Sequence, residues 1–436
     1  MADRFDVLRR RLTDGQVRVC VVGQGYVGLS LAAAAAADGM TVTGIDIDRH
    51  RVAALQDGRN VVPGVDDGMF AMAVDSGRLA FGTEFDSVTE ADVVVICVPT
   101  PITDHRPDLT AVESAGREVG SRLRRGRMVI LESTTYPGTT EQVLRPLLES
   151  GGLRAGRDFL LAFSPERIDP GNTKYGLRNT PRVVGGTDPA STEAATLFYS
   201  QLVDDVYPLS SCRAAELAKL LENTFRMVNI ALVNELAMQC HEQGIDVWEV
   251  IRAASTKPFG FMPFYPGPGV GGHCIPLDPT YLAWQSRRDT GRRFRLVELA
   301  QDINAEMPDY VTRRIVDALG ARGVPLRDAH VLALGVTYKP NVGDLRESAA
   351  VNTLAQLTRR GVRVSFHDPY VDRLDSHGLR LRRTRLTTKA IAAADAVVVL
   401  TPHDRYDFDR VLKHARLVFD ARDALDGTAN GTVVKL

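Results

Sequence analysis

A stretch near the start of the chain, residues 17–48, constrains the fold more than any other part of the sequence. It reads VRVCVVGQGYVGLSLAAAAAADGMTVTGIDID, which is an apolar run, a glycine-rich turn, an alanine-rich segment that ends at Gly39, and a second run that ends in acids. Alanine favours helix and glycine ends it, whereas runs that are apolar throughout are typical of parallel strands covered on both faces. The stretch therefore predicts a strand, a tight turn, a helix and a second strand.

The same alternation of strand and helix recurs in both halves of the chain. Strand-like runs are found in ADVVVICVPTP, RMVILEST and DFLLAFSPE, and again in HVLALGVTYKP, VRVSFHDPY, ADAVVVLTPHD and ARLVFDAR. Between the halves, residues 211–243 contain no glycine or proline and have apolar positions at helical spacing, which predicts a long spine helix. We predict an α/β fold with two Rossmann-like doubly wound domains joined by a central helical domain. The expected boundaries are a leader at 1–16, a first Rossmann domain at 17–208, a helical domain at 209–322 and a second Rossmann-like domain at 323–436.

Composition and charge exclude several classes of protein. The chain has 436 residues, is 44% hydrophobic and 25% charged, and has a net charge of −1, so no general nucleic-acid-binding surface is expected. No apolar run is long enough for a membrane helix, and the first residues lack the apolar segment of a secretory signal. We therefore expect a cytoplasmic protein with no membrane partner. The five cysteines are scattered without a C-x-x-C pair, which argues against disulfides and against a metal site.

The first glycine turn carries a nucleotide-binding motif. Gly23, Gly25 and Gly28 form G-x-G-x-x-G, in which the glycines allow a tight turn, the approach of a pyrophosphate and close helix packing. Asp46 ends the second strand, where a carboxylate accepts hydrogen bonds from a ribose and repels a 2′-phosphate, so NAD is favoured over NADP. Arg51 could stack near the adenine or be a solvated helix residue. A turn with a purely structural role is the alternative for the whole motif.

A second glycine-rich segment lies at residues 267–279. It reads GPGVGGHCIPLDP and holds Cys274 in what we expect to be an irregular loop. A cysteine there could fill space, bind a metal or act as a nucleophile. Lys219 and Asn223 lie one turn apart on the predicted spine helix, although Lys219 could instead pair with Glu216 at the surface.

Three further features stand beside strand ends. Glu166 follows a predicted strand, where ligands of α/β sheets bind, but it could be only an acid at a helix start. Thr135, in ESTTYPGTT, could cap a helix or donate a hydrogen bond from its hydroxyl. The C-terminal half has GVTYKPNVGDLRES where the first half has G-x-G-x-x-G, so we expect it to hold a different ligand.

Together these motifs resemble the UDP-glucose/GDP-mannose dehydrogenase family, the nucleotide-sugar 6-dehydrogenases. The resemblance covers nearly the whole chain after the leader and keeps the family's order: VVGQGYVG, CVPTP, ESTTYPGTT, SPERIDPGN, ELAKLLENTFR, the cysteine segment and GVTYKPNVGDLRES. His273, where UDP-glucose members typically have serine, and SPER at residues 164–167 are similar to the branch that acts on UDP-N-acetylhexosamines.

The resemblance implies an enzyme that uses NAD to oxidise C6 of the sugar twice, through a thiohemiacetal and a thioester on a cysteine. UDP-N-acetylglucosamine is the expected substrate, with UDP-N-acetylmannosamine and UDP-glucose as alternatives, and we expect a homodimer or a higher homo-oligomer. A two-electron dehydrogenase of the 6-phosphogluconate type would not need Cys274. A non-catalytic NAD-sensing scaffold is the hypothesis from a different class, and it would have no reason to keep the catalytic set.

The family's site residues are carried over onto matching motifs. The implied catalytic residues are Cys274 as nucleophile, Asp278 near the attacking water, Lys219 and Asn223 near the oxyanion, Glu166 as acid–base group, and Thr135 as a water or hydroxyl partner. The implied cofactor residues are Gly23, Gly25, Tyr26, Val27, Gly28, Asp46, Arg51, Pro99, Thr100, Thr135 and Arg346. The implied substrate residues are Glu166, Arg167, Lys219, Asn223, Gly269, Gly271 and Lys339.

Overall fold

A computed structural model describes residues 5–103, 106–169, 172, 174–272, 274–425 and 432–436. The chain forms two compact units, an N-terminal unit, Met1–Glu222, and a C-terminal unit, Asn223–Leu436.

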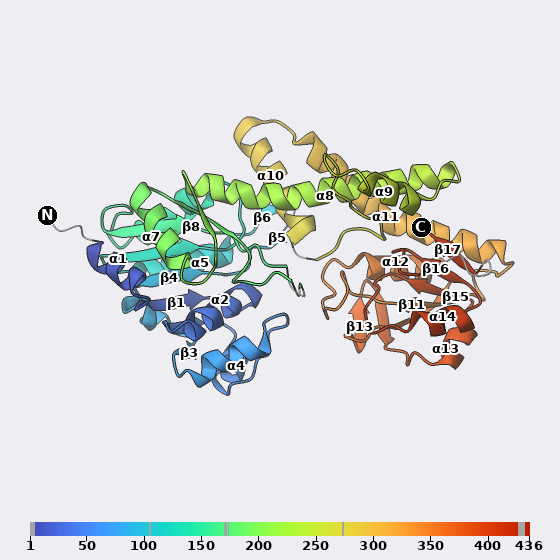
Figure 1. Ribbon diagram of the computed structural model, residues 1–436, viewed down its shortest axis with the longest axis horizontal. Coiled ribbons are helices and arrows are strands. Elements are labelled where there is room, and N and C mark those ends of the chain that lie inside the picture. Colours follow the sequence, from blue (N-terminus) through green and yellow to red (C-terminus); the bar gives the residue numbers. More distant parts are fainter. Residues whose placement is uncertain (1–4, 104–105, 170–171, 173, 273, 426–431) are drawn as a thin grey trace. The chain divides into compact units, whose positions relative to one another are not determined.

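The N-terminal unit is built around one large sheet, coloured blue to green in Figure 1. Its described residues give eight strands in the order β10-β9-β8-β7-β4-β1-β2-β3. The strands are β1 (Arg18–Val22), β2 (Thr41–Ile45), β3 (Leu79–Gly82), β4 (Val93–Ile96), β7 (Arg127–Leu131), β8 (Phe159–Phe163), β9 (Arg182–Gly186) and β10 (Val206–Leu209); a small hairpin adds β5 (Ile102–Thr103) and β6 (Arg106–Pro107). The helices are α1 (Asp6–Thr13), α2 (Tyr26–Ala37), α3 (Arg49–Gln56), α4 (Asp67–Asp75), α5 (Thr110–Arg122), α6 (Arg145–Glu149) and α7 (Pro189–Tyr199), with a 3₁₀ turn at Phe85–Thr89 and a π turn at Thr140–Leu144.

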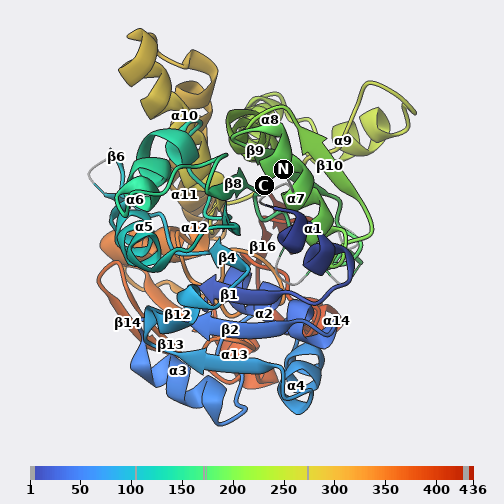
Figure 2. The ribbon, with the colours of Figure 1, turned by 90° about the vertical axis from the view of Figure 1, so that its left-hand side faces the viewer.

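The direction of the strands decides where ligands can bind. Six neighbouring strands of the sheet, β8, β7, β4, β1, β2 and β3, are mutually parallel. Figure 2 shows β4, β1 and β2 side by side among them. β9 pairs antiparallel with β8 and parallel with β10, so the last two strands run the opposite way. The carboxyl ends of the six parallel strands therefore meet at one edge of the sheet, which is the edge where α/β folds bind ligands.

The leader is part of the core of this unit. α1 buries Leu8 and Leu12 in the same apolar cluster that holds α2, α7 and alternate residues of the central strands. The leader thus contains a helix that packs on the first domain, and its Arg9 pairs with Glu193 of α7 at 3.1 Å.

The spine helix is α8 (Cys212–Glu242), which is 31 residues long and contains no glycine or proline (Figure 1). It agrees closely with the expected segment. The division between the two units falls within this helix, after Glu222.

In the part of the chain that the structure describes, the C-terminal unit consists of the end of α8, six further helices and a second parallel sheet. The helices are α9 (Val247–Ser255), α10 (Cys274–Thr290), α11 (Arg295–Ala321), α12 (Ala349–Arg359), α13 (Thr388–Ala393) and α14 (Phe408–His414), and the strands are β11 (His330–Leu334), β12 (Arg363–His367), β13 (Arg373–Ser376), β14 (Leu379–Arg382), β15 (Ala396–Val399), β16 (Val418–Asp420) and β17 (Val433–Lys435). Among the described residues the sheet order is β12-β11-β15-β16-β17, and β13 and β14 form a separate hairpin. α11 and α12 share an apolar cluster with one face of the sheet, whereas α13 and α14 share another with the opposite face (Figure 1). The predicted fold class, with two Rossmann-like sheets and a central helical region, is confirmed.

Candidate active site

The glycine turn between β1 and α2 has the backbone that its sequence predicts. Gly23 has a φ of 92°, and a Cβ placed there would lie 2.5 Å from the carbonyl oxygen of Cys97. A Cβ at Gly28 would lie 1.8 Å from the carbonyl oxygen of Gly23, so neither position accepts a side chain. At Gly25, which immediately precedes α2, no described atom lies within 4 Å of such a Cβ. The turn thus leaves open space at a helix N-terminus, where backbone N–H groups bind a pyrophosphate.

The acid at the end of β2 is fixed beside this turn. Asp46 is buried, and its carboxylate accepts the backbone N–H of Gln24 at 2.7 Å and that of Asp48 at 2.9 Å. Arg51 donates to the same carboxylate at 2.8 Å. Asp46 therefore presents a negative charge next to the nucleotide turn, and Arg51 is held by that charge.

We expect the enzyme to use NAD with a much higher kcat/KM than NADP, because a phosphate beside a buried carboxylate is strongly disfavoured. Changing Asp46 to serine removes the repulsion and frees Arg51 for a 2′-phosphate. The preference for NAD should then fall by at least about 30-fold, or about 2 kcal/mol. Steady-state kinetics with both cofactors test this, with Asp48→Ser as the control at the neighbouring acid. A similar NAD/NADP ratio in wild type and Asp46→Ser would contradict it.

Three other predicted cofactor residues stand near the turn. Tyr26 and Val27 are the first two residues of α2 and are partly buried, with Val27 packed against the core of the unit. Pro99 follows β4, the neighbour of β1, and is exposed. All three lie where the carboxyl ends of neighbouring parallel strands meet.

The ends of β4 and β7 are joined by a hydroxyl. Thr100 is buried and donates from Oγ1 to the carbonyl oxygen of Thr134 at 2.7 Å. The next residue, Thr135, is fully buried, and its Oγ1 has no hydrogen-bond partner among the described residues. A buried hydroxyl without a partner costs free energy, so this group is suited to a ligand or water at the same edge of the sheet.

Glu166 follows β8 at this edge and is held from two sides. One carboxylate oxygen accepts the backbone N–H groups of Arg167 and Ile168, each at 2.7 Å. The other lies 3.3 Å from Nη1 of Arg182, and the whole residue is 8% exposed. The neighbouring Arg167 pairs with Glu222 of α8 at 2.8 Å. The position of this carboxylate is therefore fixed before any ligand binds.

Behind Glu166 lies a buried polar cluster that the sequence analysis did not identify. Arg182 donates from Nε to Ser164 at 3.0 Å and pairs through Nη2 with Glu132. Glu132 also accepts the hydroxyl of Tyr199 at 2.5 Å and the thiol of Cys97 at 3.4 Å. Burial raises the pKa of the Glu132 carboxyl. In the sequence these are ordinary charged residues at strand ends, and only the pairing of β8 with β9 reveals that they meet.

The spine helix carries Lys219 on a buried part of its surface. Lys219 is 9% exposed, and Glu216 is fully buried. Glu216 accepts the backbone N–H of Gly138 at 2.5 Å and both the N–H and the hydroxyl of Thr140, at 2.9 and 2.7 Å. Burial raises the pKa of the Glu216 carboxyl. The alternative in which Glu216 and Lys219 form a surface ion pair is therefore wrong.

The cysteine segment differs from the expected loop in its second half. α10 begins at Cys274, so the last six residues of the segment are helical. Pro276 lies in the first turn, where a missing N–H costs nothing, and Pro279 lies inside the helix. Two prolines among glycines favoured a loop in the sequence. His273 lies outside the described residues.

In the C-terminal unit, two of the predicted catalytic residues are in direct contact. Asn223 donates from Nδ2 to the carboxylate of Asp278 at 2.5 Å, and both are buried. Asn223 belongs to α8, while Asp278 lies one turn after Cys274 on α10. The contact therefore fixes the first turn of α10, which carries the cysteine, against the spine helix.

At two glycines before Cys274, other protein atoms already occupy the space that a side chain would need. A Cβ at Gly271 would lie 2.6 Å from the carbonyl oxygen of Glu347 and 2.8 Å from Cβ of Tyr338. One at Gly269, whose φ is 135°, would lie 3.0 Å from Cβ of Ala349. Gly271 is thus required for close packing on the loop after β11, and Gly269 for close packing on the first residue of α12. A substrate contact through their backbone stays a prediction.

That loop, residues 335–348, carries the two predicted cations. Lys339 lies with its Nζ 5.8 Å from the centre of the Tyr338 ring. Arg346 is exposed and makes a bidentate contact with Asp344, with the shortest distance 2.6 Å. Asp344 thus orients the guanidinium of Arg346.

A buried histidine holds the same loop. Asn341 donates its backbone N–H to Nδ1 of His403 at 2.9 Å, so Nε2 carries the proton that is donated to Asp368 at 3.0 Å. His403 and Asp368 are fully buried. Asn341 has a φ of 63°, which is unfavourable for a residue other than glycine. The contact with His403 stabilises this conformation.

A third cation of this unit, Arg422, was not predicted from the sequence. It follows β16, and its guanidinium occupies the space that a side chain at Gly267 would need, 2.3 Å from such a Cβ. Within the described part of the chain its guanidinium makes one hydrogen bond, from Nε to the carbonyl oxygen of Leu400 at 3.2 Å, and no ion pair. Burial lowers the pKa of Arg422 to about 10. The rule that ligands collect at strand carboxyl ends could have found it, since it lies two residues after the strand.

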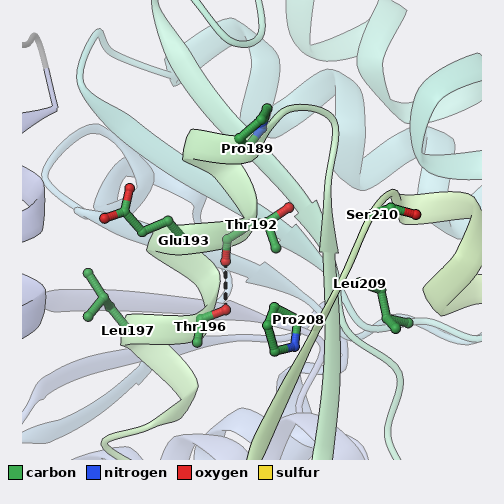
Figure 3. Close-up of a pocket in the computed structure, with 8 residues that line it drawn as sticks. All are labelled: Pro189, Thr192, Glu193, Thr196, Leu197, Pro208, Leu209 and Ser210. Atoms are coloured by element: carbon green, nitrogen blue, oxygen red, sulfur yellow. Dashed lines mark hydrogen bonds between the residues drawn. The ribbon is translucent and has the colours of Figure 1, made fainter.

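The N-terminal unit also has a surface pocket that lies away from the predicted site residues. It is formed by α7 and the end of β10 (Figure 3), and is lined by Pro189, Thr192, Glu193, Thr196, Leu197, Pro208, Leu209 and Ser210. None of the predicted site residues lines it. Because β9 and β10 run against the other strands, their carboxyl ends lie at the edge opposite the glycine turn.

The described residues contain neither a metal-binding cluster nor a membrane-spanning helix. No group of three His, Cys, Asp or Glu side chains in this part of the chain could hold a metal ion. No helix in the described ranges is long and apolar enough to cross a membrane.

A parallel sheet, a G-x-G-x-x-G turn at a helix N-terminus and an acid after the second strand together define the class of NAD-dependent dehydrogenases. The chain belongs to the UDP-glucose/GDP-mannose dehydrogenase family. Its NAD binding domain matches residues 17–203, its central domain residues 213–306, and its UDP binding domain residues 332–427.

Relatives with different substrates are similar to this chain to the same degree. UDP-N-acetyl-D-glucosamine 6-dehydrogenase of Pseudomonas aeruginosa is 35% identical, over 94% of this chain and 97% of that protein. UDP-N-acetyl-D-mannosamine dehydrogenase of Salmonella typhi is 36% identical, over 93% and 98%. The solved structure of a UDP-D-ManNAc dehydrogenase from Pyrococcus horikoshii has a TM-score of 0.86 and 33% identity, with 96% and 98% of the two chains covered. The chain is thus an NAD-dependent UDP-sugar dehydrogenase.

Proposed function

We propose that this enzyme oxidises the C6 hydroxyl of UDP-N-acetylglucosamine to a carboxylate, with two molecules of NAD consumed per sugar. The buried contact between Asn223 and Asp278, one turn from Cys274 at the start of α10, carries this proposal. A two-electron dehydrogenase would need no such cysteine. The N-terminus of a helix also stabilises a thiolate, which is the nucleophilic form. The relatives named for UDP-N-acetylhexosamines support the choice of an N-acetylated sugar.

The glycine turn and Asp46 fit the pyrophosphate and ribose of NAD, which accepts a hydride from C6 in each oxidation. The residues of the chain have the remaining roles. Lys219 and Asn223 stabilise the oxyanion that forms at C6. Cys274 attacks the aldehyde and keeps it bound until the second oxidation has produced a thioester.

Hydrolysis of the thioester needs a base. We propose Glu166 for this role, because its carboxylate is already fixed by two backbone N–H groups. Water loses a proton to Glu166 as its oxygen attacks the carbonyl carbon, and the bond to sulfur then breaks. Thr135, whose buried hydroxyl has no described partner, can hold the attacking water.

The C-terminal unit supplies the cations for the UDP group. Lys339 and Arg422 both stand after strands of the second sheet, and the packing of Gly267 on Arg422 brings that cation to the cysteine segment. The net charge of the chain is −1, so a diphosphate depends on such local cations. We propose that residues 323–436 hold the nucleotide and that Arg346 contacts the cofactor.

The function is tested with a panel of UDP-sugars, by measuring NADH and the mass of the product. Two NADH per sugar and a product 14 Da heavier, the replacement of CH₂OH by COOH, are expected with UDP-N-acetylglucosamine at the highest kcat/KM. A higher value with UDP-N-acetylmannosamine or UDP-glucose would assign the substrate to that sugar instead. One NADH per sugar would contradict the four-electron chemistry, and no NADH with any sugar would favour the scaffold.

An apolar stripe on α8 supports a homodimer. Leu217, Leu221, Phe225 and Leu232 are between 44% and 62% exposed, and at 100° per residue they lie within an arc of about 80° on one side of the helix. Exposed apolar stripes of this kind mark protein–protein contacts.

We expect Leu221→Glu to shift the protein toward the monomer, because a charge in the centre of an apolar interface is desolvated without a partner. Light scattering after gel filtration at micromolar concentration measures this. Val7→Glu is the matched control, since Val7 on α1 is 61% exposed and Leu221 is 62% exposed. An unchanged mass for Leu221→Glu would remove this stripe from the interface.

A further inference from the structure

The cluster behind Glu166 contains two carboxylates and one cation. Arg182 lies between Glu132, which it contacts through Nη2, and Glu166, whose oxygen is 3.3 Å from Nη1. Arg182 and Glu132 are 3% and 1% exposed, so water does not screen their charges. The guanidinium is also stacked on the ring of Tyr199, with its carbon 4.5 Å from the ring centre.

The contacts in this cluster are unequal. Arg182 is fixed by Ser164, by the Tyr199 ring and by its shorter contact with Glu132, whereas its contact with Glu166 is the longest of the three polar ones. The guanidinium is therefore shared unequally between the two carboxylates, and Glu132 is the nearer one. Glu166 is held in place by the weaker of these two contacts.

We propose that Arg182 and Glu132 are positioning residues for thioester hydrolysis, which act through Glu166: Arg182 fixes its carboxylate, and Glu132 prevents Arg182 from pairing with it too tightly. This inference rests on the proposed role of Glu166. In the step concerned, Glu166 takes a proton from water, the water oxygen bonds to the carbonyl carbon, and the carbon–sulfur bond breaks. The thiolate of Cys274 then recovers the proton, so atoms and charge balance.

The cluster is also in contact with the nucleotide turn. Cys97, which donates its thiol to Glu132, has its Cβ 3.2 Å from the position of a Cβ at Gly28. An unbroken series of contacts thus runs from the cofactor turn through Cys97, Glu132 and Arg182 to the base. Among the described residues, the groups that donate hydrogen bonds to Glu166 are Arg182 and two backbone N–H groups, with Glu132 beyond Arg182.

The two variants Glu132→Gln and Arg182→Gln have opposite expected effects on Glu166. Without the Glu132 charge, Arg182 pairs more fully with Glu166, and the acid limb of the pH profile for hydrolysis should move to lower pH. Without Arg182, the carboxylate loses a cation, and the acid limb should move to higher pH. Both variants should hydrolyse the thioester at least about tenfold more slowly than wild type, since a misplaced or mistuned base loses much of its effect.

The measurement mixes the full-length enzyme with excess NAD and UDP-N-acetylglucosamine, or with whichever UDP-sugar of the panel gives two NADH. Samples are quenched in acid at successive times and at several pH values. NADH absorbance and the mass of the intact protein are recorded. Both variants should release a burst of two NADH per active site and then accumulate the thioester adduct on the protein, which wild type does not.

Arg127→Gln is the matched control. Arg127 begins β7, the strand that Glu132 follows, and pairs at the opposite end of that strand with the buried Asp92. The Arg127→Gln variant should have a lower melting temperature, but it should not accumulate the thioester adduct or shift the pH profile for hydrolysis. If Arg182→Gln does not fold, Glu132→Gln alone decides, through its adduct and the shift of its acid limb to lower pH, and Arg182→Lys, which keeps the cation, should leave the acid limb near that of wild type.

The outcomes separate this inference from the proposed function. Slow turnover without adduct, or pH profiles that do not move in opposite directions, would overturn the positioning role while wild type still makes the uronic acid. A wild type that never yields two NADH per sugar would instead overturn the function on which the inference rests.

Discussion

Changing Cys274 to alanine is expected to lower uronic acid formation by at least about 1,000-fold, because the aldehyde can no longer be held covalently between the two oxidations. Binding of NAD and of the UDP-sugar should change little, since the change removes one sulfur atom and no charged contact to the nucleotide. Product mass and calorimetric titration with each ligand measure the two effects.

Cys240→Ala is the control for this variant. Cys240 is buried on α8 in an apolar cluster with Trp248 and Ile251, so its loss should cost stability, about 1 kcal/mol, and leave turnover near that of wild type. Near-normal acid production by the Cys274 variant, or an equal loss of activity in both variants, would exclude Cys274 as the nucleophile.

The second large effect is expected on binding of the nucleotide. Lys339→Ala and Arg422→Ala should each weaken UDP binding by roughly 10- to 100-fold, because a hydrogen bond to a charged group contributes about 1.5–3 kcal/mol. The affinity for NAD should stay the same. Calorimetric titration of each variant with UDP and with NAD, separately, tests this expectation.

Lys413→Ala serves as the control for net charge, because Lys413 is an exposed cation on α14 in the same unit. A UDP affinity within about twofold of wild type for Lys339→Ala would show that this lysine does not hold the nucleotide. The same result for Arg422→Ala would show that the guanidinium beside Gly267 has a packing role alone.

Features set by local sequence were predicted well. The first glycine turn, Asp46 and the long α8 follow from residue types at short spacing, and each is found where it was expected. The two parallel sheets follow from apolar runs that alternate with helices. The start of α10 was missed, because two prolines and four nearby glycines predict a loop unless the contact of Asp278 with Asn223 is known.

Features set by distant pairing were not predictable. Glu132 and Arg182 are 50 positions apart and meet only because β9 runs antiparallel beside β8. Arg422 follows the last long strand-like run of the sequence, and its burial depends on a glycine 155 positions earlier. Charged residues at strand ends look alike in a sequence, and the arrangement of the strands decides which of them become buried.

The close packing of Gly271 on the loop at residues 335–348, and of Gly269 on the start of α12, has a consequence for altering this enzyme. A new side chain at Gly271 would separate the segment that carries the cysteine from the loop that carries Lys339, and one at Gly269 would separate it from α12. Libraries aimed at a new sugar preference should therefore leave both backbones untouched. Variation belongs at positions whose side chains, and not their main chain, border the sugar.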